Sequence, residues 1–373
     1  MKILITDYGK YIPYGSSYYE SIELFNFLKA NGEDVDILKY VIISPIDGSI
    51  TENEALIRKY NFIISYTPFD FDFIIRYKKT AKINPKIIFI DEFNFIKVIG
   101  SKIGFFDPKK ALYNKFIKIL QDIKIYAVHS RIDEDFVHKT ITNIDTIYIN
   151  PYVKESYFVK PNKIYRDKLV FSGRLNPSIN NINLLLKAIK YIVKETSFLE
   201  EHNLSVLLTN TDESEEIKNK INKMKLNEYF IFIPPIKNYP ELIASLGFSV
   251  VLPLQDIRIG SILESMAAGL PIIIPDNKNS TKLFTFNGVV RERIIENGKN
   301  GLIYDHEDYK DLAEKIMFMM TINKEKYMEM RDFAYSYASD FSSKYEYKKI
   351  YDSIKEIYLN ETKAVESREF SKI

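Results

Sequence analysis

Two carboxylates stand eight residues apart on either side of a glycine–serine pair, with Asp256 before Gly260-Ser261 and Glu264 after it. A glycine–serine pair that opens a helix leaves free backbone N–H groups, which can hold a phosphate. Glu264 then lies in the first turns of that helix, where its carboxylate could accept two hydroxyls of a ribose. Asp256 lies in the loop, on the side of a sugar. The alternative is an ordinary helix start with a capping serine and solvated acids.

Two other small-residue turns precede helices or follow strands. Gly15 and Ser16 stand just before a helix, where backbone N–H groups can approach an anion or a sugar oxygen. They are not part of a G-x-G-x-x-G dinucleotide fingerprint, and a simple helix cap is the alternative. Gly173 and Arg174 follow a strand that ends on Ser172. An arginine fork suits a diphosphate, and a surface arginine after a turn is the alternative.

Composition excludes several kinds of site. The chain has 373 residues and no cysteine, so disulfides, thiol nucleophiles and cysteine-ligated metals are absent. Its four histidines lack metal-ligand spacing, and we expect no metal. Abundant Lys and Glu are typical of a hot-living source, and an AT-rich genome gives the same bias. Neither a signal peptide nor a membrane-spanning run occurs, so we expect a soluble, cytoplasmic protein.

Short apolar runs alternate with helix-like stretches along the whole chain, which predicts βαβ units and parallel sheets. The pattern stops at a polar stretch, 152–166, which we interpret as a linker, and then restarts. We therefore expect two doubly wound domains that face each other across a cleft, 1–160 and 161–340. A tail helix at about 341–360 returns to the first domain, and the polar residues from 361 are expected to fray. Ligands bind beyond the carboxyl ends of such strands.

Taken in order, these segments resemble the retaining GT-B glycosyltransferases, the family that includes sucrose synthases and many bacterial and archaeal mannosyl- and glucosyltransferases. The resemblance includes Gly15, Gly173-Arg174-Leu175 and the acid pair with Ala267-Gly269-Pro271. It also includes 149–153, which is similar to the family's "I-P-N-G-V" segment, and Asn297-Gly298-Asn300-Gly301. The last helices are similar to the family's closing segment.

The resemblance implies a metal-independent enzyme that binds a nucleotide sugar, such as a UDP-, GDP- or ADP-sugar, mainly through the C-terminal domain. Glu264 would bind the ribose and Asp256 the hydroxyls of the donor sugar. Arg174 and the amides near Gly260 and Ser261 would hold the diphosphate. The acceptor would be a glycan, a lipid-linked molecule or a protein, and a lipid-linked acceptor implies peripheral contact with the inner membrane face.

The sequence departs from the family's pattern at three places. The usual lysine after the Gly-Arg pair is replaced by Asn180-Asn181, and Arg258 could supply the missing charge. The first acid is an aspartate rather than the commoner glutamate. Where the family often has a histidine after an N-domain strand, this chain has Asp91-Glu92. His129, after another strand, is the other candidate that would face the cleft, and we count it with Asp256 and Glu264 as a candidate catalytic residue.

Two other functions remain open. A sugar-nucleotide-binding or glycan-binding protein without turnover is favoured by the missing lysine. A viral-type enzyme that glucosylates DNA bases is disfavoured, because a net charge of +2 gives no basic face for a duplex. A local basic face toward nucleic acid or an anionic membrane, or else a solvated helix face, could come from Lys78, Lys79, Lys82, Lys86, Lys109 and Lys110.

Overall fold

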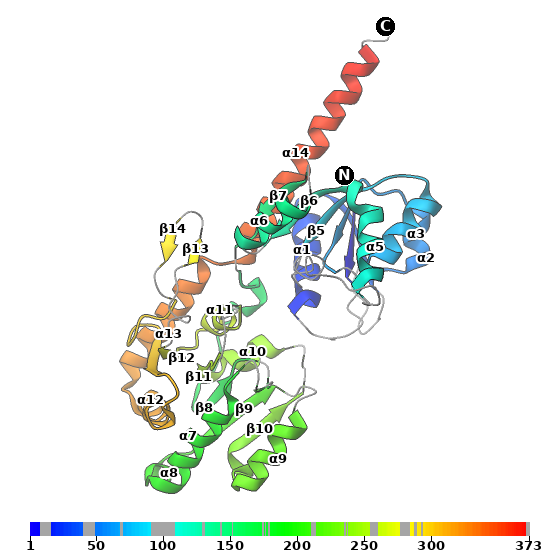
Figure 1. Ribbon diagram of the computed structural model, residues 1–373. Coiled ribbons are helices and arrows are strands. Elements are labelled where there is room, and N and C mark those ends of the chain that lie inside the picture. The colour runs from blue at the N-terminus through cyan, green and yellow to red at the C-terminus, as the bar shows by residue number, and fades with distance from the viewer. Residues whose placement is uncertain are drawn as a thin grey trace. The chain divides into compact units, whose positions relative to one another are not determined.

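The structure is a computed structural model, and it describes most of the chain. The described residues are 1–7, 16–39, 49–67, 70–90, 109–128, 131–141, 144–150, 152–173, 175, 177, 180–209, 214–234, 236, 238–253, 260–276, 284–286, 289–291 and 294–370. They form two compact units (Figure 1). Unit 1 is Met1–Asn150 with Lys344–Ile373, and unit 2 is Pro151–Ser343. The chain thus first passes from unit 1 to unit 2 after Asn150, whereas the sequence predicts this boundary at residue 160.

Unit 1 is built on a parallel sheet whose strand order is β3-β2-β1-β4-β5-β6-β7. The order reverses between β1 and β4, as in a doubly wound fold. The strands are β1 (Lys2–Asp7), β2 (Asp34–Lys39), β3 (Ser49–Ile50), β4 (Phe62–Ser65), β5 (Lys86–Ile90), β6 (Ile123–Val128) and β7 (Asp145–Tyr148). The helices are α1 (Ser16–Ala30), α2 (Glu52–Ile57), α3 (Phe71–Ala81), α5 (Lys109–Ile119), α6 (Arg131–Thr140) and α14 (Ser343–Phe370).

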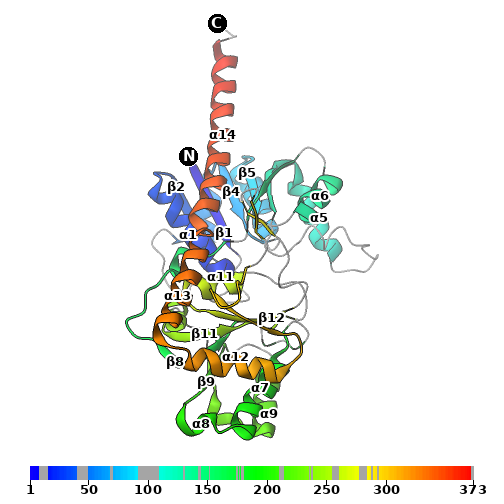
Figure 2. The same cartoon turned by 90° about the vertical axis from the view of Figure 1, so that its left-hand side faces the viewer.

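Unit 2 repeats this plan with the strand order β10-β9-β8-β11-β12-β15, again parallel throughout. Its order reverses between β8 and β11. The strands are β8 (Tyr165–Phe171), β9 (Ser205–Thr209), β10 (Phe230–Ile233), β11 (Leu246–Val250), β12 (Ile272–Asp276) and β15 (Gly301–Asp305). The helices are α7 (Ile182–Glu195), α8 (Phe198–Glu201), α9 (Ser214–Met224), α10 (Tyr239–Ala244), α11 (Gly260–Ala267), α12 (Tyr309–Thr321) and α13 (Lys324–Ser339). Figure 2 shows α12 beside α7.

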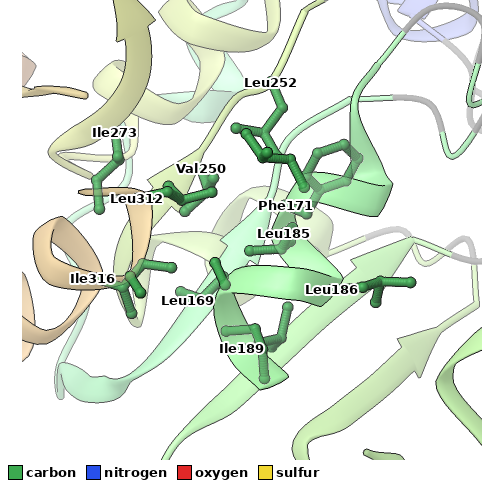
Figure 3. Packing of buried hydrophobic residues seen from close by; sticks show 14 of the residues in the cluster. Leu169, Phe171, Leu185, Leu186, Ile189, Val250, Leu252, Ile273, Leu312 and Ile316 are labelled. Atoms are coloured by element: carbon green, nitrogen blue, oxygen red, sulfur yellow. The ribbon is translucent and has the colours of Figure 1, made fainter. Parts of the chain in front are cut away.

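The core of unit 2 explains why its sequence folds this way. The apolar runs of β8 and β11 are buried, and α7 adds a stripe of leucines and isoleucines at helical spacing. Figure 3 shows Leu169 and Phe171 of β8 packed near Leu185 and Ile189 of α7. Burying such side chains stabilises a domain by roughly 1.5–3 kcal/mol each, before the entropy of ordering is subtracted. The two strands that flank the reversal are thereby fixed by the core beneath them.

The stretch that we interpreted as a linker, 152–166, is in large part packed structure. Val153 N–H donates to the Phe341 carbonyl at 2.8 Å, and Ser343 N–H donates to the Val153 carbonyl at 2.8 Å. A short 3-10 helix, η3 (Glu155–Tyr157), follows, and strand β8 already begins at Tyr165. The linker prediction was wrong here because the polar side chains that suggested it make their contacts with distant parts of the chain.

The tail also differs from the prediction. Helix α14 continues to Phe370, so the residues from 361 that we expected to fray are helical. Glu, Lys, Ala and Arg in this stretch have high helix propensity, which explains the continuation. Within unit 1, Phe27 of α1 packs against Tyr347 and Tyr351 of α14, with ring centroids 6.0 and 6.3 Å apart. The predicted return of a C-terminal helix to the first unit is confirmed.

Several smaller elements were not anticipated. Among them are helix α6, the antiparallel pair β13 (Phe284–Phe286) and β14 (Val289–Arg291), and strand β15. The segment with Gly298 and Gly301 forms a turn at 298–300 that leads directly into β15. Within the described ranges, no helix is both long and apolar enough to cross a lipid bilayer.

Candidate functional site

Glu264 lies at the carboxyl edge of the unit 2 sheet. It is in α11, which follows β11, and β11 is paired with β8 where the strand order reverses. Open α/β sheets bind ligands in the crevice outside the strand ends at such a reversal. The topology therefore brings Glu264 to the same edge as Gly173, which follows β8.

The carboxylate of Glu264 lies near two side chains from one other segment of the chain. Tyr157 of η3 donates a hydrogen bond to it, and the ammonium of Lys154 lies close enough to attract it. Both partners are buried, with 8% and 4% of their surface exposed. Glu264 itself is half-buried. The interpretation of this residue as a solvated acid at a helix start is therefore wrong.

Burial raises the pKa of Glu264, and Lys154 and Tyr157 act against that rise because each favours the ionised form. A carboxylate has about four lone-pair positions on its two oxygens. The hydrogen bond from Tyr157 uses one of them. Glu264 is thus a carboxylate in a low-dielectric setting with lone-pair positions beyond the one that Tyr157 uses.

Tyr239 of α10 adds a hydroxyl to this edge. Its hydroxyl hydrogen-bonds with Thr209, the last residue of β9, and burial raises the pKa of Tyr239 to about 12. The phenol therefore stays protonated at neutral pH. The charge of Glu264 adds to the rise, which shows that Tyr239 and Glu264 lie within electrostatic reach of each other.

Gly173 is fixed by its neighbour Asn180. The glycine has a φ of +154°, and a Cβ atom added there would lie 2.9 Å from the side-chain nitrogen of Asn180. Asn180 is buried, and Asn181 caps α7 by accepting a hydrogen bond from Leu184 N–H. The two asparagines that replace the family's usual lysine are therefore structural: one packs on the glycine turn and the other starts a helix.

The two ends of α11 differ in how closely the described residues pack on them. Among those residues, apart from its chain neighbours and its own helix, none comes within 4 Å of a Cβ atom built on Gly260. At the other end, the buried Arg331 donates to the carbonyl of Ala268 at 3.2 Å, and Gly269 adopts a φ of +75°. The small residues Ala267, Ala268 and Gly269 allow this close packing. The C-terminal end of the helix is thus anchored by Arg331.

Several predicted site residues cannot be placed. Outside the described part of the chain lie Asp256, Arg258, Arg174, Gly15, His129, Asp91 and Glu92. For Ser16, the structure gives the backbone as the first residue of α1. Of the predicted binding residues, the structure describes Gly260, Ser261 and Glu264 together on α11.

Two other observations concern ions and charged surfaces. Within the described ranges, no three His, Cys, Asp or Glu side chains form a group that could hold a metal. Two lysines of the predicted basic face are paired with acids: Lys78 with Asp122 and Lys86 with Glu361. These ion pairs reduce the net positive charge that this face could offer a polyanion.

Sequence reasoning missed Lys154, Tyr157 and Tyr239. The first two lie in the segment that we interpreted as a linker, and the third opens a short helix. For Lys154 and Tyr157, the sequence shows only a lysine and a tyrosine one helical turn apart, directly after the apolar Val153. Such a pattern is common on solvated surfaces, so it could not identify a site.

Comparison with known proteins bears on these observations. Residues 166–321 match the family of group 1 glycosyl transferases. No curated protein matches the chain by sequence. Among solved structures, sucrose-phosphate synthase from Thermosynechococcus elongatus is similar over 96% of this chain and 99% of its own, with a TM-score of 0.65 and 13% identity. Anabaena Alr3699/HepE, solved with UDP and glucose, is similar over 95% and 100%, with a TM-score of 0.66 and 13% identity.

A third similar structure is the pneumococcal O-GlcNAc transferase GtfA in complex with UDP and GlcNAc. It matches 80% of this chain and 57% of its own, with a TM-score of 0.52 and 15% identity. These likenesses establish the fold, and the predicted GT-B architecture is confirmed. The match of residues 166–321 to the group 1 glycosyl transferases supports the predicted enzyme class, a glycosyltransferase.

Proposed function

We propose that this glycosyltransferase takes its sugar from a nucleoside diphosphate and transfers it with retention and without a metal ion. The observation that carries the proposal is the carboxylate of Glu264 at the strand-order reversal of unit 2. A carboxylate there, next to the start of a helix, can accept the two hydroxyls of a ribose while the helix N–H groups hold a phosphate. UDP is the first donor to test, because the similar HepE and GtfA structures contain it.

The proposed reaction breaks the bond between the sugar's C1 and a diphosphate oxygen. A bond from C1 to the acceptor oxygen forms on the same face of the sugar. The acceptor's proton passes to the leaving diphosphate, so the step needs no protein nucleophile. What the protein must supply is stabilisation of the charge that develops on the diphosphate.

That stabilisation comes, in this proposal, from the two turns at the edge of the unit 2 sheet. The N–H groups at Gly260 and Ser261 open α11, and the Gly173 turn brings backbone close to the same edge. Arg174 and Arg258 are the proposed cations, which makes a metal ion unnecessary. Asp256 is the proposed partner of the sugar hydroxyls.

The acceptor that we propose is a glycan, with a lipid-linked molecule or a protein as further candidates. GtfA is an O-GlcNAc transferase, and a similar structure, S. aureus TarM, contains fondaparinux and α-GlcNAc-glycerol. His129 of unit 1 is the proposed acceptor-side residue. The cytoplasm, with contact at the inner membrane face for a lipid-linked acceptor, is the location that this proposal assigns.

A binding protein without turnover is the second candidate. The observation that favours it is that Asn180 and Asn181 have structural contacts where the family's lysine would contact the diphosphate. Titration calorimetry with UDP, GDP and ADP, followed by a transfer or hydrolysis assay with their sugars, separates the two. Binding with turnover that persists in EDTA supports the enzyme as proposed. Tight binding with no hydrolysis or transfer across a panel of acceptors would support the second candidate, and turnover that EDTA abolishes would refute metal independence.

A further inference from the structure

Three buried serine hydroxyls form one connected group in unit 2. Ser249 Oγ donates to Ser172 Oγ at 2.7 Å, and Ser172 Oγ lies 2.9 Å from Ser265 Oγ. Ser265 Oγ donates to the Ser261 carbonyl at 2.9 Å and also lies 3.2 Å from Ser249 Oγ. The exposed fractions of Ser172, Ser249 and Ser265 are 7%, 0% and 0%. We call Ser172, Ser249 and Ser265 the serine chain.

The protons of the serine chain all have acceptors. Each hydroxyl has one proton to donate. Ser249 donates to Ser172, either hydroxyl of the Ser172–Ser265 pair can be the donor, and Ser265 can donate to the Ser261 carbonyl or to Ser249. Every hydroxyl therefore has an acceptor within reach, and the chain connects the sheet with the first turn of α11.

The serine chain joins the elements that carry the proposed donor site. Ser249 is in β11, and Ser172 directly follows β8 and precedes Gly173. Ser265 is in α11, next to Glu264. The surrounding side chains are apolar, and hydroxyls buried among them are costly unless they are paired. A shift of α11 against the end of β8 would lengthen or break the hydrogen bonds of Ser265.

We propose that the serine chain is a positioning device that sets the spacing between the Gly173 turn and the first turn of α11. This inference rests on the proposed function, since the donor's diphosphate would bridge those two turns while its ribose contacts Glu264 on α11 alone. The three serines do not touch the donor in this proposal. They act by holding apart, at one distance, the two pieces of backbone that do.

The proposal predicts different effects on the binding of uridine and on the binding of UDP. Uridine needs only α11, whereas UDP needs both turns at the right spacing. Ser249→Ala removes the first donor of the chain from a residue that is completely buried. It should lower the affinity for UDP about fivefold, the equivalent of one ordinary hydrogen bond, and leave the affinity for uridine within about twofold.

A matched control is Ser245→Ala. Ser245 Oγ donates to the Leu242 carbonyl at 2.6 Å at the end of α10, so the change also deletes a serine hydroxyl bound to a helix carbonyl in unit 2. It lies outside the serine chain, and the ratio of UDP to uridine affinity should stay as in the wild type. Ser172→Ala, which removes the middle hydroxyl, is the second test if Ser249→Ala does not fold.

The double variant Ser172→Ala/Ser249→Ala tests whether the serines act as one unit. Loss of one hydroxyl should already free the two turns to change their distance. The double variant should therefore lower the ratio of UDP to uridine affinity no further than either single variant does. The measurement is calorimetric titration with UDP and competition by uridine. If both single variants bind UDP and uridine like the wild type, the inference is wrong while the proposed function stands. If the wild type binds none of UDP, GDP and ADP, the proposed function is wrong and the inference falls with it.

Discussion

The hydroxyl of Tyr157 donates a hydrogen bond to the carboxylate of Glu264, although the two residues are far apart in the sequence. Tyr157 comes from the segment that enters unit 2, and Glu264 from the helix at the edge of its sheet. The contact orients an acid that the low-dielectric surroundings would otherwise favour in its neutral form. A substitution of Tyr157 should therefore change the pKa of Glu264 without altering Glu264 itself.

Glu264→Gln should weaken nucleotide binding. The amide loses the charge and one acceptor oxygen, and hydrogen bonds to a charged group contribute roughly 1.5–3 kcal/mol. Affinity for UDP should therefore fall by about one to two orders of magnitude in calorimetric titration. Glu241→Gln, an exposed glutamate on α10, is the control and should bind normally. An unchanged affinity in Glu264→Gln would remove the main residue-level support for the donor site.

Binding of a UDP-sugar should depend on pH through Glu264. The ionised carboxylate accepts ribose hydroxyls more strongly than the neutral acid does, so binding is strongest above its pKa and weakens as the pH falls through it. Because burial raises that pKa, the loss should begin at a higher pH than for an ordinary glutamate. UDP-glucose is the ligand to use, since its diphosphate does not titrate in this range. Glu264→Gln should remove this part of the pH dependence.

Tyr157→Phe should move that loss to still higher pH. The tyrosine hydroxyl lowers the pKa of Glu264, and its removal lets the pKa rise further. Affinity at neutral pH should change less than affinity under mild acid. Tyr165→Phe, at a partly exposed residue at the start of β8, is the control. A Tyr157→Phe profile that coincides with that of the wild type would show that the hydrogen bond has no influence on the acid.

Gly173→Ala should destabilise unit 2 and distort the turn after β8. The new methyl group would meet the amide of Asn180, and the φ of +154° disfavours any side chain. Strain of this kind costs about 1–3 kcal/mol. Thermal unfolding should show a lower midpoint, and Gly173→Ala/Asn180→Ala should recover the part that comes from the collision. A double variant no more stable than the single one would assign the whole effect to the backbone.

Arg331→Met should strongly destabilise unit 2. The guanidinium of Arg331 is buried and donates to the carbonyls of Leu246, Ala244 and Ala268 at 3.0, 2.9 and 3.2 Å. Methionine leaves those acceptors without this donor, so we expect a loss of about 3 kcal/mol or more in the free energy of unfolding. Asp332→Asn, at the exposed neighbour, should change it by less than about 0.5 kcal/mol. Denaturant unfolding of the two variants makes the comparison.

The sequence predicted the fold better than it predicted the site. Buried strands and amphipathic helices have local periodicity, and this periodicity predicted the βαβ alternation that both units show. The acid at Glu264 was found because a glycine–serine pair and a carboxylate share one helix. Lys154 and Tyr157 were missed because their contacts with Glu264 form only when the segment at the start of unit 2 packs on α11. Residue spacing along the chain does not show such a long-range contact.

The same limit applies at the tail. The polarity of the residues from 361 suggested fraying, whereas helix propensity, a weaker local preference, decided the outcome. The absence of a dinucleotide fingerprint at Gly15, by contrast, is a plain fact of the sequence. Local rules therefore served for element type and for motif exclusion, and they failed where distant segments meet.

Helix α14 has a consequence for how the protein is made. Unit 1 contains the first strand of the chain and nearly all of its last helix, α14. Glu33 accepts hydrogen bonds from the amino group of Met1 and from Tyr351 of α14, at 2.8 and 2.9 Å. Asn150, the last residue of the first stretch of unit 1, donates to Glu346. As the chain leaves the ribosome, the first sheet emerges early yet waits for these partners until all of unit 2 has been synthesised. The unit that starts first is thus the one completed last.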